Sequence, residues 1–189
     1  MNELSNTHVA VLVTEGFEQA ELTEPVKALR AAGADVDIIS QKAGPVRSFK
    51  HHDPAETVNA NLSFDEAKPD RYDALMLPGG AINADTIRMV PQARAFVKAF
   101  DGARKPIAAI CHAPWLLVSA GITNGRTLTS YFTIQDDLRN AGSTWVDREV
   151  VVDDNLVTSR QPDDIPAFNR EMIGLFARST RGAATTARS

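Results

Sequence analysis

Residues 108–115 have the sequence AAICHAPW and contain the chain's only cysteine, Cys111, followed directly by His112, one of four histidines. The apolar run 105–110 before the cysteine predicts a buried strand, and the stretch 114–121, which opens with proline and ends with glycine, predicts a helix. The cysteine therefore falls in a tight strand-to-helix turn, which is the geometry of a nucleophile elbow. A helix N-terminus beside a thiol favours the thiolate, so we expect a lowered thiol pKa.

The alternative is a structural role. A lone cysteine is more often a small buried hydrophobic residue than a nucleophile. The setting of Cys111 favours the nucleophile, because a buried structural cysteine does not need a turn of this kind.

Length and composition predict one domain over residues 1–189. Hydrophobic residues make up 43% and charged residues 23% of the 189, as in ordinary globular proteins. The net charge of −4, without a basic cluster, argues against a nucleic-acid partner. A single cysteine excludes an internal disulfide and suits the reducing cytoplasm. The start of the chain lacks a signal-peptide pattern, and apolar runs fall short of the roughly 20 residues of a membrane span, so we expect a cytoplasmic protein without a membrane partner.

Strands alternate with helices along the chain, which predicts a parallel sheet covered on both faces. We expect an ordered core over about residues 8–177 and, because residues 178–189 are small and polar, a frayed tail. The expected strands are 8–14, 35–40, a short one at 46–50, 72–77 and 105–110, with a hairpin over 149–159. The expected helices are 19–32, 91–103, 114–121, 132–141 and 162–177.

Ligands of such folds bind beyond the carboxyl ends of the strands. Three strand ends carry notable residues: 15–21, the glycines Gly79 and Gly80, and the pair Cys111 and His112. Their convergence predicts a site at this edge of the sheet.

His51, His52 and Asp53 are potential metal ligands. They are adjacent in the chain and lack the spacing of a zinc site, so a solvated turn is the favoured interpretation. We expect neither a metal nor a cofactor.

A cysteine nucleophile needs a base or a lowered pKa. Because the chain has no histidine after His112, the candidates are His112 itself and a carboxylate. Glu18 and Glu21 stand at the start of the first predicted helix, and a carboxyl beside a thiolate is driven to its protonated form, in which it donates a hydrogen bond to sulfur. Acidic residues also occupy first turns simply to suit the helix dipole, and spacing alone slightly favours that explanation.

Several motifs, taken together, resemble the DJ-1/PfpI superfamily, and most closely its PfpI-like branch. They occur in the family's order over about residues 8–177. The matching stretches are GFEQAEL at 16–22, LPGG at 77–80, AICHAP at 109–114, VVVD at 150–153 and LVTSRQPDDIPAF at 156–168.

The resemblance implies a flavodoxin-like three-layer α/β/α sandwich that forms dimers or higher oligomers. It implies that Cys111 is the reactive cysteine, that Glu21 rather than Glu18 is its protonated partner, and that His112 is the adjacent histidine. Asp85 matches an acidic residue that a neighbouring subunit supplies to this histidine. The amides of Gly80 and His112 match the oxyanion pocket, where they would stabilise a developing negative charge.

The chain departs from the family pattern at two points. The loop 80–85 is one residue longer than in the best-known PfpI members, and Ala113 replaces a glycine common among relatives. The histidine that the DJ-1 branch and class I glutamine amidotransferases place after the cysteine is missing, which argues against glutaminase chemistry.

Family members are assigned peptidase, deglycase or glyoxalase, chaperone and sensor activities, and a fold does not choose among them. Our first hypothesis is a stress-response hydrolase in which Cys111 attacks a glyoxal-type adduct or an acyl group and His112 relays the proton. A peptidase is the weaker form, because nothing in the sequence marks a cleft for a peptide chain. The alternative is a non-enzymatic oxidative-stress sensor or chaperone-like protein in which Cys111 is oxidised to a sulfinic acid held by Glu21.

Overall fold

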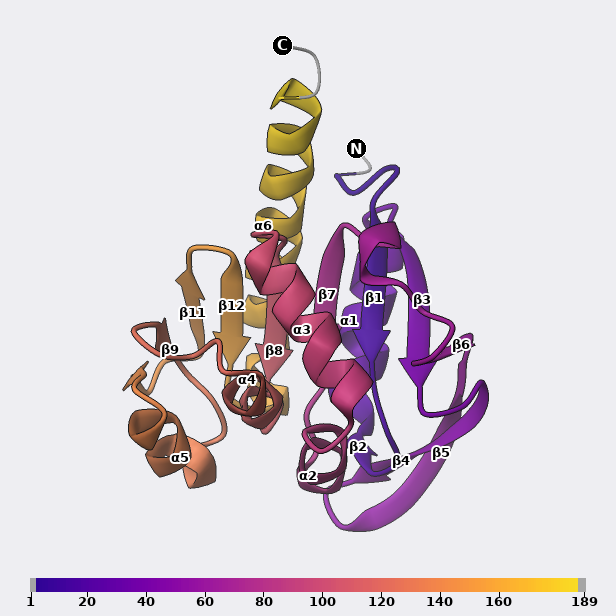
Figure 1. Ribbon diagram of the computed structural model, residues 1–189. Coiled ribbons are helices and arrows are strands. Elements are labelled where there is room, and N and C mark those ends of the chain that lie inside the picture. Colours follow the sequence, from indigo (N-terminus) through magenta and orange to yellow (C-terminus); the bar gives the residue numbers. More distant parts are fainter. Residues whose placement is uncertain (1–2, 187–189) are drawn as a thin grey trace.

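The computed structural model describes residues 3–186, with side chains described as far as Thr180. In this part of the chain a seven-stranded sheet has the strand order β11-β12-β8-β7-β1-β3-β6 (Figure 1). All neighbours in this sheet are parallel except the β11–β12 pair. The strands are β1 (His8–Leu12), β3 (Asp35–Ser40), β6 (Leu62–Ser63), β7 (Ala74–Leu77), β8 (Ile107–Ile110), β11 (Val150–Asp153) and β12 (Leu156–Ser159).

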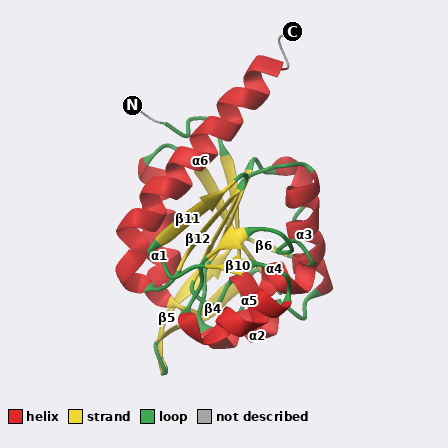
Figure 2. Cartoon of the chain, turned by 90° about the vertical axis from the view of Figure 1, so that its left-hand side faces the viewer, coloured by secondary structure: helices red, strands yellow, loops and turns green. Residues whose placement is uncertain are grey.

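Helices cover both faces of this sheet. Figure 2, which views the molecule from the side, shows α1 and α6 on one side and α3 and α4 on the other. The structure is thus the predicted three-layer α/β/α sandwich with a mostly parallel sheet. The helices are α1 (Gln19–Ala31), α2 (Ala81–Ile87), α3 (Pro91–Gly102), α4 (Pro114–Ala120), α5 (Gln135–Asn140) and α6 (Ile165–Thr186).

The core is divided by the sheet into two apolar layers. In β1, Val9 and Val11 pack into the layer that holds α1 and α6, whereas Ala10 and Leu12 pack into the layer that holds α3 and α4. Side chains alternate across a strand, so a strand buried on both faces must be apolar throughout. This requirement explains the continuous apolar runs by which the sequence predicted the central strands.

A three-stranded sheet packs beside the main one, in the order β2 (Phe17–Glu18), β4 (Gly44–Lys50) and β5 (Asp53–Ala60). β4 and β5 form a hairpin with His51 and His52 at its turn. The sequence predicted this turn and part of β4 but not β5. Five of the eight β5 residues are exposed and only Ala60 is buried, and Pro54 fits an edge strand, so the apolar signal is weak.

Three further segments differ from the prediction. Residues 81–87 form α2, a short helix that the sequence did not predict. The predicted helix 132–141 is divided into a 3₁₀ turn, Phe132–Ile134, and α5. The last helix continues beyond residue 177 to Thr186, so the segment predicted to fray is helical as far as it is described. Residues 1–2 and 187–189 lie outside the described part of the chain.

A short parallel pair, β9 (Thr127–Leu128) and β10 (Thr144–Trp145), flanks α5. The predicted hairpin around Asp154 is present, with that residue in the left-handed conformation at φ 56°. In the described residues, the structure contains no helix long and apolar enough to cross a membrane.

Candidate active site at the carboxyl edge of the sheet

Cys111 directly follows β8 and has a left-handed backbone, with φ 63°. Such a φ is unusual for a non-glycine residue, and this strain is typical of nucleophile elbows. Backbone bonds hold the turn on both sides: the Cys111 amide donates to the carbonyl of Ser159 in β12 (3.0 Å), and the amide of Tyr131 donates to the Cys111 carbonyl (2.8 Å). The sequence-predicted elbow is therefore present, anchored to the neighbouring strand.

His112 places its ring against the cysteine. Its Nδ1 lies 3.2 Å from the Cys111 Sγ, and its Nε2 lies 3.3 Å from the Oγ1 of Thr133. The ring stacks on Tyr131 with centroids 4.8 Å apart. Partial burial lowers the pKa of His112, so the imidazole is neutral at neutral pH and able to accept a proton.

Glu21 approaches from the first turn of α1 and is fully buried. Its Oε2 accepts a hydrogen bond from the Gly79 amide (3.0 Å). Its Oε1 is buried without a hydrogen-bond partner among the described residues. The carboxyl as a whole interacts with the Cys111 thiol, beside which it is buried. Burial raises the pKa of Glu21 to about 8, so at neutral pH the carboxyl carries a proton that it can donate to sulfur.

The thiol itself differs from the prediction. Burial raises the pKa of the Cys111 thiol, and the Glu21 carboxyl raises it further, whereas backbone N–H bonds from Gly80 and His112 lower it. The sequence predicted a lowered pKa from the helix N-terminus alone, and that prediction is wrong because the thiol is almost completely buried beside a carboxyl. Cys111 and Glu21 thus share a buried site in which the two groups cannot readily be ionised at the same time.

Gly79 and Gly80 follow β7 and bring backbone amides into the site. A Cβ on Gly79 would lie 2.5 Å from the Glu21 Oε2 and 2.6 Å from the Cys111 Cβ. A side chain there would therefore push the Glu21 carboxyl or the cysteine turn out of place. Gly80 has φ 86°, which favours glycine. The amides of Gly80 and His112 both point at the Cys111 sulfur.

Asn83 holds the glycine turn in place, a role the sequence did not predict. Its side chain is fully buried in α2. Nδ2 donates to the carbonyls of Pro78 (3.1 Å) and Gly79 (2.9 Å), while Oδ1 accepts from the Thr14 amide (2.7 Å) and hydroxyl (3.0 Å). One amide side chain therefore ties the segments that follow β1 and β7 together. Through the Gly79 carbonyl it also fixes the peptide unit that carries the Gly80 N–H.

A cavity of about 410 Å³ opens above the cysteine. Its size suits a small substrate or one modified side chain rather than a long peptide. The lining includes residues from the β4–β5 hairpin and from the segment before α6 that the sequence did not assign to the site. The lining residues are Glu18, Glu21, His51, His52, Gly80, Ala81, Cys111, His112, Tyr131, Thr133, Gln161, Pro162 and Asp163.

Glu18, the second acidic candidate, lies at this cavity, where its Oε2 accepts the His51 amide (2.9 Å) rather than facing the sulfur. His51 and His52 line the same cavity from the hairpin turn. Among residues 3–186, no three His, Cys, Asp or Glu side chains converge on a position that could hold a metal ion.

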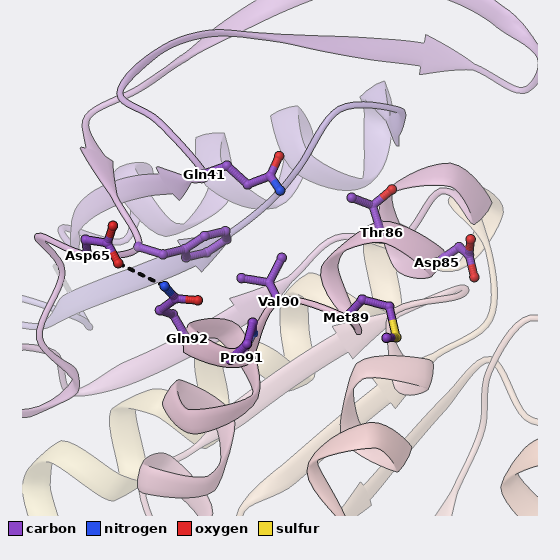
Figure 3. Close-up of a pocket in the computed structure, with 9 residues that line it drawn as sticks. Gln41, Asp65, Asp85, Thr86, Met89, Val90, Pro91 and Gln92 are labelled. Atoms are coloured by element: carbon purple, nitrogen blue, oxygen red, sulfur yellow. Dashed lines mark hydrogen bonds between the residues drawn. The ribbon is translucent and has the colours of Figure 1, made fainter.

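Asp85 lies elsewhere in its own chain. It is exposed on α2 and lines a separate hollow of about 580 Å³ with Thr86, Met89 and Gln92, which Figure 3 shows. In that hollow Gln92 donates a hydrogen bond to Asp65 (2.9 Å). The structure therefore brings together Cys111, His112, Glu21 and Gly80, but not Asp85.

The fold and the site define an α/β protein with a buried cysteine, a neutral histidine and a protonated carboxyl at the carboxyl edge of a parallel sheet. The chain belongs to the DJ-1/PfpI family, whose model matches residues 7–175.

Relatives of known name match over most of their length. The chain is 45% identical over 169 residues to protein/nucleic acid deglycase 2 of Escherichia coli, covering 89% of this chain and 96% of that protein. It is 44% identical over 171 residues to general stress protein 18 of Bacillus subtilis, and the match covers 90% of this chain and 98% of that protein. The crystal structure of Drosophila melanogaster DJ-1beta superposes with a TM-score of 0.80 at 26% identity. The superposition covers 94% of this chain and 97% of the Drosophila chain.

Proposed function

We propose that this protein is a stress-response deglycase that uses Cys111 to remove glyoxal-derived groups from amines or thiols. The observation that carries the proposal is the 3.2 Å approach of the Cys111 Sγ to the His112 Nδ1, beside the buried Glu21 carboxyl. The relatives named deglycase and general stress protein support the same class of reaction.

The site has the groups that such a reaction needs. The sulfur displaces the amine: its bond to the amine-bearing carbon forms as the carbon–nitrogen bond breaks, the thiol proton passes to His112, and the amine leaves with that proton. The resulting enzyme-bound hemithioacetal shifts a proton from this carbon to the adjacent carbonyl carbon, which gives a thioester of a 2-hydroxy acid. Water then releases the acid and restores the thiol, so the sum is adduct plus water giving amine plus 2-hydroxy acid, without an external oxidant.

Two features of the site assist these steps. The amides of Gly80 and His112 face the sulfur, where they can stabilise the oxyanions that form on the neighbouring carbon. The protonated Glu21 carboxyl donates to the sulfur and can exchange its proton during the shift, since its pKa of about 8 lies close to neutral pH.

The test uses N-acetylarginine and N-acetylcysteine modified by methylglyoxal as substrates. Wild-type protein is expected to release the free amino acid and a 2-hydroxy acid in equal amounts, and Cys111→Ala is expected to release neither above the uncatalysed rate. Absence of Cys111-dependent release would overturn the proposal. Oxidation of Cys111 to the sulfinic acid at low peroxide in such an inactive protein would favour the redox-sensor alternative.

We further propose that the protein self-associates as a homodimer or higher oligomer and acts in the cytoplasm. Ile82 and Met89 flank Asp85 on and after α2 and are exposed apolar side chains, as at interfaces between subunits. Light scattering should give a mass above 20.5 kDa, and Met89→Asp should lower it. A wild-type mass of one chain would overturn this proposal and, with it, the prediction that Asp85 completes a neighbouring subunit's site.

A further inference from the structure

Arg160 directly follows β12, at the edge of the sheet where the site lies. The last residue of that strand, Ser159, accepts the Cys111 amide (3.0 Å), so Arg160 stands beside the cysteine turn. Its guanidinium donates to both carboxylate oxygens of Asp164, through Nε (2.8 Å) and through Nη2 (3.0 Å). The paired side chains of residues 160 and 164 therefore span the segment 161–163, which connects β12 to α6.

This pair, which we call the Arg160–Asp164 clamp, has a defined geometry. Two parallel bonds between a guanidinium and a carboxylate fix orientation as well as distance. The Asp164 side chain is 6% exposed, so its charge needs the arginine as a partner. The guanidinium also donates to Asp147 (2.6 Å), and the Asp164 amide donates to the Gln161 carbonyl (3.0 Å). Side-chain and backbone bonds thus hold the same short segment.

The segment 161–163 lines the cavity above Cys111. Gln161 is half-buried there, and its side-chain amide has no hydrogen-bond partner among the described residues. An amide has donor and acceptor atoms without a charge, so it suits the uncharged hydroxyl and carbonyl groups of a glyoxal-derived adduct. Binding cavities use a few polar groups of this kind, held in place, to orient their ligands.

We propose that Gln161 is a substrate-binding residue of this site and that the Arg160–Asp164 clamp positions it. The inference rests on the proposed function, because the adduct is the ligand that Gln161 would bind. The family motifs of the sequence include these residues without giving them a role, and the names of the relatives assign them none.

The two parts of the inference predict related kinetic effects. Gln161→Ala removes a hydrogen bond to the substrate and leaves the reacting groups in place, so KM is expected to rise about 3- to 10-fold with little change in kcat. Arg160→Lys keeps the positive charge that Asp164 needs, but an ammonium cannot form the two parallel bonds. KM is expected to rise in this variant too, because Gln161 is held less firmly.

A double-mutant cycle separates positioning from a general structural role. If the clamp acts through Gln161, Arg160→Lys raises KM in the wild-type background but not in the Gln161→Ala background. Arg170→Lys is the matched control, because Arg170 pairs with Glu171 on α6 and neither residue lines the cavity. An equal rise in both backgrounds would overturn the role of the clamp, and an unchanged KM in Gln161→Ala would overturn the binding role.

A binding measurement keeps this inference separable from the proposed function. The Gln161 side-chain amide gives ¹H–¹⁵N NMR signals that are identified by their loss in Gln161→Ala. In Cys111→Ala, the methylglyoxal adduct of N-acetylarginine is expected to shift these signals but not those of Gln41, an exposed glutamine outside the cavity.

The outcomes of the two measurements differ. A shift of the Gln161 signals, with a wild type that does not release the amine, would reject the proposed function and retain Gln161 as a binding residue. Turnover by wild type without a shift of these signals would overturn the inference alone. Absence of both turnover and shift would overturn both.

Discussion

The Sγ of Cys111 lies 3.2 Å from the Nδ1 of His112, although the two residues are adjacent in the chain. Neighbouring side chains on a strand point to opposite faces. The left-handed backbone of Cys111, with φ 63°, removes that alternation and turns both side chains into one cavity. Nucleophile and base thus come from a single turn whose geometry the fold imposes.

Replacing His112 by alanine is expected to lower deglycase kcat by about 10²–10⁴-fold, the usual contribution of a general base. His8→Ala is the matched control, because His8 is an exposed histidine at the start of β1. Steady-state kinetics of both variants checks this. Wild-type activity in His112→Ala would contradict the role of the histidine and favour a function that needs Cys111 and Glu21 alone.

Glu21 is expected to make stability depend on pH. Its pKa is about 8 in the folded protein against an ordinary value of 4.5, so the folded state retains a proton that the unfolded state has lost between these pH values. The Glu21 contribution to stability is therefore complete below pH 4.5 and is lost as the pH rises toward 8, at up to about 1.4 kcal/mol per pH unit.

Urea unfolding of wild type and Glu21→Gln at pH 5.5, 6.5 and 7.5 measures this loss. Glu21→Gln is expected to become more stable relative to wild type with each rise in pH. Glu24→Gln, an exposed glutamate on the same helix, is the control and is expected to follow wild type. Parallel curves for wild type and Glu21→Gln would show that Glu21 is already ionised.

Asn83→Ala is expected to lower the free energy of unfolding by about 2–3 kcal/mol, because it leaves buried backbone groups of Thr14, Pro78 and Gly79 without partners. It should also lower kcat, since the Gly80 amide loses its support. Chemical denaturation and kinetics of the folded variant test both effects. Unchanged stability would contradict the account of the glycine turn.

Gly79→Ala is expected to reduce activity at least as strongly as His112→Ala. Its Cβ would lie 2.5 Å from the Glu21 Oε2, so the carboxyl or the elbow must move. Gly102→Ala is the control, because a Cβ there meets no described atom within 4 Å. Activity close to wild type in Gly79→Ala would contradict the requirement for a fixed arrangement of the Glu21 carboxyl and the cysteine turn.

The sequence predicted the central fold because fully buried parallel strands require unbroken apolar runs, as in β1 and β7. It did not predict β5 or α2, whose residues are mainly exposed and whose structure depends on tertiary contacts such as the bonds of Asn83. The end of α6 was placed too early because small polar residues were interpreted as fraying, whereas the helix continues to Thr186.

In the site, the turn containing Cys111 and the approach of Glu21 could be predicted from the order of strand ends and from the family motifs. The positions of Thr133, Tyr131 and the hairpin histidines could not, because they depend on how distant loops fold back over the sheet. The direction of the thiol pKa shift was also predicted wrongly. Burial is the largest influence on this pKa and raises it, and the sequence alone does not reveal how deeply Cys111 is buried. The pair His51 and His52, at a predicted turn, was the available signal for the hairpin.

The central claim, that Cys111 is the nucleophile, is tested most directly by acid-quenching the enzyme during turnover of a methylglyoxal adduct and measuring the mass of its peptides. We predict a group derived from methylglyoxal on the peptide that contains Cys111. It should form as fast as the amine is released and disappear when the substrate is exhausted. Release of amine at the wild-type rate by Cys111→Ser, with Cys111 unmodified in every quenched sample of wild type, would contradict the claim.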